Sequence, residues 1–431
     1  MHFPTRDALE ATLPEPSIPD FAAVRYEPDT PAVDDVVAET RDAVADLPLS
    51  SLPEGGTVAI GLGSRGIDDV ASIARTVVDE MRERGLEPVV VPAMGSHGGA
   101  TPEGQRRTLE GIGLSEEALG CPIDARMDTT VLGTSDVGAP VPFSTAALEA
   151  DGIVVINRVK AHTNFTGRIE SGLTKMSVIG LGKQAGASAA HEYALEEGYV
   201  PVLESALEVI EAEAPLLGGV AIVENFHDRT AHVEGVPAAA LPEAEVPLLE
   251  RANEYMPTLP FEDLDVLVVD EIGKDVSGAG MDTNVIGRYQ VLNAADPETP
   301  DVDRIVVRGL TEATHGNGNG IGLADVTTRA TVEALDLDQV YTNALTSASL
   351  SKAQIPVVMP DDEFALRAAL STIGTYDPET VRIAWIENTG HLSSFRVSRA
   401  LAEVAPEPVS IEAWHSLVFE GGKPVFEPTT S

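Results

Sequence analysis

Cysteine is nearly absent from this sequence. Cys121 is the only cysteine in 431 residues, so no internal disulfide can form. A single cysteine also cannot build a cysteine-based zinc site or an iron–sulfur cluster within one chain. This cysteine usage is typical of an intracellular protein.

Basic residues are scarce as well. The chain has 28 Lys and Arg against 69 Asp and Glu, which gives a net charge of −41, and the acidic residues are spread along the chain. We interpret this as a surface adapted to a salt-rich cytoplasm, where screening removes the self-repulsion. Nucleic acids and anionic membranes bind clustered basic residues, so neither is expected as a partner and a small ligand is favoured.

Long apolar segments are missing too. No stretch approaches the length of a membrane span, and the N-terminal sequence is polar and acidic, unlike a signal peptide. We therefore expect a soluble, cytoplasmic protein of a salt-adapted cell. The hydrophobic fraction of 43% is enough for the cores of two domains, while the oligomeric state stays open.

What the sequence does contain is a regular alternation of strand and helix patterns. Residues 57–95 read as strand, helix and strand, in the segments TVAIGLG, DDVASIARTVVDEMRERG and EPVVVPAMG. A strand at 151–159 and a helix within 191–214 continue the pattern, and a segment rich in Pro, Ala and Glu precedes a new strand near 260. We predict two α/β domains with parallel or mixed sheets, a cofactor-binding and catalytic domain over 1–259 and a second domain over 260–431.

A glycine-rich turn follows the first strand. Gly61 to Gly66 has the G-x-G-x-x-G spacing that places backbone N–H groups around a phosphate, and Arg65 within it favours an anion. The next strand ends at Pro92 without the acidic residue that an NAD ribose requires. An NAD-type oxidoreductase and a turn without a ligand both remain as alternatives.

His97 lies just after a predicted strand, where open α/β sheets place their ligands. Its glycine neighbours remove bulk around the imidazole and favour a functional role over that of a solvated loop histidine. The glycine-rich loop 314–322, which contains His315, is a second candidate for a segment that faces a ligand.

The stretch from Arg158 to His191 is the most informative. The chain has six lysines, and three of them lie here: Lys160, Lys175 and Lys183. Arginine cannot supply a nucleophilic nitrogen, so lysines kept in a chain that otherwise avoids them suggest roles for a primary amine or a compact cation. The alternative is a basic rim that offsets the global charge. His162 and His191 add two imidazoles that can act as acid, base or metal ligand.

These segments resemble the lactate racemase family, whose members racemise or epimerise 2-hydroxy acids with a nickel-pincer nucleotide. Ser64 and Arg65 are similar to the family's turn at the cofactor phosphate, and Gly95-Ser96-His97 is similar to its first catalytic histidine loop. His162 resembles the second catalytic histidine.

The resemblance continues in the run Ser171-Gly172-Leu173-Thr174-Lys175, which is similar to the segment whose lysine carries the cofactor covalently. His191 follows Lys175 by sixteen positions, as the family's nickel-binding histidine follows that lysine. The family also implies an active site in the cleft between two α/β domains, and a cofactor made by partner biosynthesis proteins.

The roles that the resemblance implies are specific. His97 and His162 would be paired bases on a small 2-hydroxy acid, while Ser64 and Arg65 would bind the cofactor phosphate. Lys175 and His191 would hold the cofactor and its nickel. The candidates for binding the substrate carboxylate are Arg158, Lys160 and Lys274.

The chain also departs from the family pattern. It has extra residues around 168–170, Leu62 stands where the family has Asp, and the segment 273–284 is divergent. A relative of the same fold that binds a ligand without the cofactor is therefore an alternative. A plain metallohydrolase using the three histidines ranks last, because no H-x-H or H-E-x-x-H spacing supports it.

Overall fold

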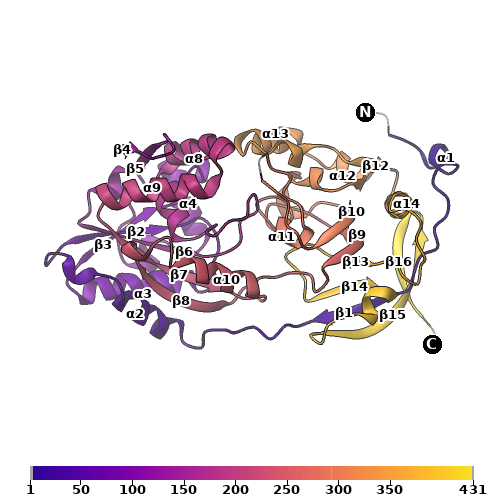
Figure 1. The fold of residues 1–431 in the computed structure, drawn as a ribbon, viewed down its shortest axis with the longest axis horizontal. Helices are drawn as coiled ribbons and strands as arrows, with labels where there is room; N and C mark the ends of the chain where they lie inside the picture. The colour runs from indigo at the N-terminus through magenta and orange to yellow at the C-terminus, as the bar shows by residue number, and fades with distance from the viewer. Residues whose placement is uncertain (1–2, 293, 430–431) are drawn as a thin grey trace. The chain divides into compact units, whose positions relative to one another are not determined.

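The structure is a computed structural model that describes residues 3–292 and 294–429, and its chain divides into two compact units (Figure 1). Unit 1 comprises Met1–Asp29, Thr163–Phe165 and Pro257–Ser431, and unit 2 comprises Thr30–His162 and Thr166–Met256. Among the described residues, no helix is long and apolar enough to cross a membrane.

Unit 2 is built on a sheet whose strand order is β3-β2-β6-β7-β8 in the part of the chain described. The first four strands are parallel to one another, and β8 is antiparallel to β7. The strand bounds are β2 (Thr57–Leu62), β3 (Glu87–Pro92), β6 (Gly152–Arg158), β7 (Leu216–Glu224) and β8 (Thr230–Pro237). A hairpin of β4 (Thr129–Thr134) and β5 (Pro140–Ser144) stands apart.

The two faces of this sheet are covered differently. Val58, Ile60 and Leu62 alternate along β2 and pack into one core with the apolar stripe of α3 (Val70–Glu83). Each such side chain, when fully buried, adds about 1.5–3 kcal/mol of hydrophobic free energy. Figure 1 shows α2 (Val36–Ala45) and α3 across the sheet from α8 (Lys183–Glu197) and α9 (Tyr199–Glu213).

The segment 173–181 lies on the second face, where the strand residues are small. A Cβ on Gly219 would lie 2.9 Å from the Leu173 side chain, and one on Gly61 would lie 3.7 Å from the Leu181 side chain. The segment consists of the short helix α7 (Leu173–Lys175) and a π-helical stretch, Met176–Gly180, that leads into α8.

The helix predicted within 191–214 is two helices. α8 ends at Glu197 and α9 begins at Tyr199, with Gly198 between them at φ +84° and ψ 159°. Because residues with a side chain rarely adopt this φ, glycine permits the break, and the start of α9 folds back against α8.

The other helices of unit 2 are α4 (Pro102–Gly111), α5 (Glu116–Leu119), α6 (Thr145–Leu148) and α10 (Glu245–Tyr255). α4 is well specified by its sequence, since Thr101 accepts a hydrogen bond from the Gly104 N–H and Pro102 occupies the first turn.

Unit 1 contains a larger mixed sheet, with the order β12-β11-β10-β9-β13-β14-β1-β15-β16 over the described residues. The strands from β12 to β13 are parallel, and the pairs from β13–β14 onward are antiparallel. The parallel strands are β9 (Asp263–Val269), β10 (Asp301–Val307), β11 (Val326–Thr328), β12 (Val357–Met359) and β13 (Ile383–Ile386). The others are β1 (Phe21–Tyr26), β14 (Ser394–Ser398), β15 (Val409–Glu420) and β16 (Lys423–Pro428).

The helices of unit 1 are α1 (Arg6–Leu9), α11 (Thr283–Ile286), α12 (Arg329–Glu333), α13 (Leu337–Thr346), α14 (Asp362–Ser371) and α15 (Arg399–Glu403). Residues 1–29, which the sequence analysis placed in the N-terminal domain, belong to this unit because β1 pairs with β14 and β15. The predicted fold class, two α/β units with parallel or mixed sheets, is confirmed.

Candidate functional site

The predicted site residues of unit 2 follow the carboxyl ends of three neighbouring parallel strands. Ser64 and Arg65 follow β2, His97 follows β3, and His162 follows β6. The carboxyl ends of parallel strands meet at one edge of a sheet, which is where open α/β sheets bind ligands. Residues up to 98 positions apart in sequence are thereby brought to one edge.

His97 and Ser64 are in direct contact. The Ser64 Oγ lies 2.5 Å from the His97 Nδ1, which joins the turn after β2 to the loop after β3. This bond orients the imidazole, and the His97 side chain is exposed to solvent. Both residues were predicted from the sequence with separate roles, Ser64 at the cofactor phosphate and His97 as a base.

Two fully buried polar side chains donate hydrogen bonds to the backbone at and just before the loop that carries His97. The Gln105 Nε2 donates to the backbone oxygens of Gly95, at 2.9 Å, and His97, at 3.3 Å. The Lys183 Nζ donates to the Pro92 oxygen at 2.7 Å, and burial lowers the pKa of Lys183 to about 8. One of the three lysines that the sequence singled out therefore supports the loop.

One glycine beside His97 has a packing role. Gly98 adopts φ +66°, and a Cβ there would lie 2.5 Å from the Gly104 carbonyl carbon. The loop can approach the start of α4 only because both positions lack side chains. Of the glycines that were predicted to leave space around the imidazole, Gly98 instead makes room for backbone, whereas a Cβ on Gly99 would meet nothing within 4 Å.

Lys175 ends a short helix with a buried acidic cap. Glu245 accepts hydrogen bonds from the backbone N–H groups of Leu173 and, at 3.0 Å, Thr174, and burial raises the pKa of this carboxyl group. Gly172 leaves the room that Glu245 needs, because a Cβ there would lie 2.0 Å from the Glu245 Oε1. The carboxylate fixes the first turn that carries Lys175.

The Lys175 amine lies in a cationic neighbourhood. Burial lowers the pKa of Lys175 to about 8, and the nearby charges of Arg65 and Lys160 lower this pKa further. Glu170 opposes the shift. Three basic side chains that the sequence proposed separately are thus close enough to perturb one another.

The loop from Lys160 to Ser171 presents His162. Its ends are joined by backbone hydrogen bonds between Lys160 and Ser171, at 3.0 and 3.2 Å. The buried Glu170 accepts from the backbone N–H of His162 and from that of Gly167, the latter at 3.1 Å, and burial raises the pKa of Glu170. The extra residues around 168–170, which depart from the family pattern, therefore include the group that holds His162.

His191 lies on α8 with one ring nitrogen engaged. Its Nδ1 is 2.8 Å from the hydroxyl oxygen of Tyr199, the first residue of α9. Burial lowers the pKa of His191, and the charge of Lys175 lowers it further. Tyr199 was not proposed from the sequence, and nothing in its local pattern marks it, because its contact depends on the turn at Gly198.

The three candidate residues for the substrate carboxylate have different surroundings. Arg158 forms an ion pair with Glu224, a buried carboxylate on β7. The charge of Lys160 contributes to the lowered pKa of Lys175. Lys274 belongs to unit 1, where its Nζ donates to the Gly278 oxygen at 2.5 Å.

Over residues 3–292 and 294–429, no three or more His, Cys, Asp or Glu side chains are grouped so that they could hold a metal ion. His97, His162 and His191 thus do not form the three-ligand cluster that a plain metallohydrolase requires. A metal at His191 would need further ligands from a bound group.

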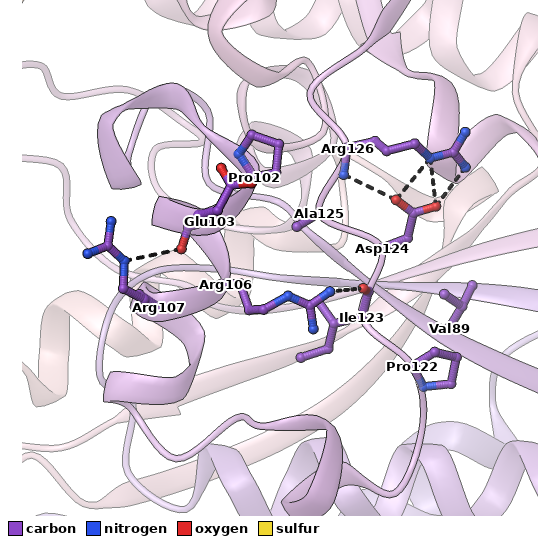
Figure 2. A pocket seen from close by; sticks show the side chains of 10 residues that line it. All are labelled: Val89, Pro102, Glu103, Arg106, Arg107, Pro122, Ile123, Asp124, Ala125 and Arg126. Atoms are coloured by element: carbon purple, nitrogen blue, oxygen red, sulfur yellow. Dashed lines mark hydrogen bonds and ion pairs between the residues drawn. The ribbon is translucent and has the colours of Figure 1, made fainter.

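A cavity of about 680 Å³ lies beside β3 and α4, and its lining residues do not include these histidines (Figure 2). Three arginines line it, but the Arg106 Nη1 bonds Glu116 at 2.7 Å, and Arg126 pairs with Asp124 and Glu149, both at 2.6 Å. Arg107 donates to the backbone oxygen of Glu103 at 3.4 Å. Carboxylates neutralise two of the three cations, so the cavity does not present a concentrated positive charge.

Comparison with known proteins adds a structural relative. No protein-family model and no curated protein sequence matches the chain. The structure of the lactate racemase apoprotein from Thermoanaerobacterium thermosaccharolyticum matches it with a TM-score of 0.54, covering 86% of this chain and 98% of that one. The chain has the fold of lactate racemase.

The match to lactate racemase agrees with the resemblance drawn from the motifs. Its sequence identity is 12%, so the likeness concerns the fold alone. The roles of individual residues stay predictions, and they depend on the side-chain contacts described above.

Proposed function

We propose that this protein is a racemase or epimerase of a small 2-hydroxy acid that works with a covalently attached nickel-pincer nucleotide. The observation that carries the proposal is the grouping of Lys175, His191 and Arg65 beside the Ser64–His97 pair, in a chain with the lactate racemase fold. These are the residue types that the motif resemblance assigns to the cofactor and to one base.

The residues present fit such a cofactor. With a pKa of about 8, roughly a tenth of the Lys175 amine is neutral at pH 7, far more than for an ordinary lysine, and a neutral amine is the form that makes a covalent bond. His191 is close enough for the Lys175 charge to lower its pKa, so one group could engage both side chains. Arg65 would bind the phosphate through charge-assisted hydrogen bonds.

When bound, the cofactor would supply the acceptor and donor of the substrate hydride. The chain's own residues would bind the substrate and move its proton. His97, oriented by Ser64 at Nδ1, would exchange the hydroxyl proton through Nε2, and His162 would do so for the opposite enantiomer. With two bases, the same site would serve either enantiomer.

Lys160 is the favoured carboxylate ligand of the three candidates. Arg158 is compensated by Glu224, and binding a substrate carboxylate there would compete with a buried ion pair. Lys160 lies with Arg65 and Lys175, where three like charges favour an anion. Lys274 remains a candidate from unit 1.

The test is to produce the chain together with cofactor-making proteins and to measure nickel, a visible absorption band and the mass of the peptide that contains Lys175. The expected result is stoichiometric nickel, an absorption band absent from the metal-free protein, and an added mass on that peptide only. K175R is the matched control, since it keeps the charge but cannot form the bond. Absence of all three signals in the unmodified chain would overturn the proposal.

Substrate class is tested on the loaded protein. Solutions of single enantiomers of 2-hydroxy acids with different side chains should lose optical activity. The hydrogen on the substrate Cα should not exchange with solvent at every turnover, because the hydride returns to that carbon. Loaded protein that racemises none of them would leave the cofactor assignment standing and contradict the activity.

A further inference from the structure

Tyr199 lies between two residues that the proposed function uses. Its hydroxyl oxygen is 2.8 Å from the His191 Nδ1, and the two ring centroids are 5.9 Å apart at an interplanar angle of 84°. The same ring lies 6.1 Å from the His162 ring, at an angle of 30°. One side chain therefore contacts the nickel-ligand candidate and one of the base candidates.

The fold holds Tyr199 in this place. Gly198 turns the chain at φ +84°, so that the first residue of α9 faces back toward α8. The Tyr199 ring then packs against a small cluster of Ala190, Ala194 and Val202. A tyrosine phenol is neutral and protonated at physiological pH. It can therefore act as a hydrogen-bond partner and does not add a charge.

We infer that Tyr199 is a positioning residue for His191: its phenolic oxygen accepts a hydrogen bond from Nδ1–H, which makes Nε2 the nitrogen that binds metal. The inference rests on the proposed function, in which His191 is the nickel ligand. A neutral imidazole carries one proton, and a nitrogen can bind metal only through a free lone pair. A metal-binding histidine usually donates its other N–H to an oxygen, which fixes both tautomer and ring orientation.

The alternative arrangement gives the opposite outcome. If the phenol instead donated to Nδ1, the imidazole proton would sit on Nε2 and block metal binding there. The inference can therefore be tested without nickel, by determining which ring nitrogen of His191 is protonated in the cofactor-free protein.

The inference can be tested by nitrogen-15 NMR of histidine-labelled, cofactor-free protein at pH 8, with the His191→Gln variant used to identify the signals of His191. We expect the unmodified chain to show His191 protonated at Nδ1. In Y199F, the signals should move to a mixture of tautomers or to the Nε2–H form. Y193F removes a hydroxyl from the same helix, two residues from His191, and should match the unmodified chain.

A His191 protonated at Nε2 in the unmodified chain, or unchanged signals in Y199F, would overturn the inference. The first of these results does not require any variant to fold. In loaded protein, Y199F should lose nickel to a chelator about 10- to 100-fold faster while keeping the added mass on the Lys175 peptide. Loss of that mass in the unmodified chain would instead indicate failure of the proposed function, and the NMR result would still decide the Tyr199 contact.

Discussion

Both units contain buried lysines with a lowered pKa, but the amines have different neighbours. In unit 1, the Lys352 Nζ donates to the Thr163 oxygen at 3.2 Å and to the Asn164 side chain at 2.5 Å, and burial lowers its pKa to about 8. In unit 2, Lys183 has the same lowered pKa and likewise bonds a backbone oxygen. The charge of Lys274 lowers the pKa of Lys352 further, whereas two cations, Arg65 and Lys160, act on Lys175 in addition to burial. A lowered lysine pKa therefore does not by itself indicate a catalytic or cofactor-binding role, and the partners of the amine distinguish the cases.

The glycine-rich loops differ in the same way. In unit 1, a Cβ on Gly320 would lie 1.8 Å from the Ala279 oxygen, and one on Gly280 would lie 2.1 Å from the Asn319 oxygen. The loops 273–284 and 314–322 thus pack backbone against backbone. In unit 2, a Cβ on Gly66 would meet nothing within 4 Å. The glycines of these two unit 1 loops serve packing, whereas Gly66 in the turn after β2 has open space beside it.

The largest expected effect concerns Lys175. K175A should abolish the attached mass, the nickel content and all racemisation, while the thermal unfolding midpoint changes little, because no described fold contact depends on its amine alone. Mass spectrometry, metal analysis and calorimetry measure these quantities. Full activity in K175A would contradict the proposal that Lys175, unlike Lys183 and Lys352, holds the cofactor.

The two histidine bases come next. H97Q and H162Q should each lower kcat by about 10²- to 10⁴-fold, the usual contribution of a positioned general base, while nickel content is retained. Rates measured separately from each enantiomer would show whether the two residues serve opposite faces. H315Q, in the loop 314–322 of unit 1, is the control and should retain the rate.

The contrast between glycines predicts a stability difference. G320A should destabilise unit 1 by about 3 kcal/mol or more, because its Cβ would overlap backbone at a residue with φ +109°. G66A should change the free energy of unfolding by less than about 0.5 kcal/mol. Urea unfolding of both variants checks this, and equal stabilities would contradict the packing role of the unit 1 loops.

The smallest effect is a pH dependence. Lys183 and Lys352 have a pKa of about 8 in the folded chain against the ordinary 10.5, so between these values the unfolded chain holds more protons. Stability therefore rises with pH through this window, by about 2 kcal/mol per lysine from pH 8 to pH 10. Urea unfolding of K183M and K352M at both pH values should show a smaller rise than the unmodified chain. An unchanged rise would mean that neither amine is desolvated.

Several features of the fold could be read from the sequence. The alternation of apolar strands with helices having apolar residues three and four positions apart is a local signal, and it predicted the strands at 57–62 and 87–92 and the two α/β units. The helix within 191–214 was predicted as one element, because one glycine in an otherwise helical pattern does not reveal its φ. The pairing of β1 with β14 and β15 could not be predicted from the local sequence, because it joins positions about 370 or more residues apart.

Sequence and tertiary structure thus determined different things about this protein. The sequence by itself determined which segments carry histidine, lysine and glycine after strand ends, because strand ends and residue types are local properties. Only the tertiary structure decided that Ser64 meets His97, that Lys183 supports a loop while Lys175 lies among cations, and that Tyr199 reaches His191. Those outcomes depend on burial and hydrogen bonds between segments that meet only once the sheet has assembled.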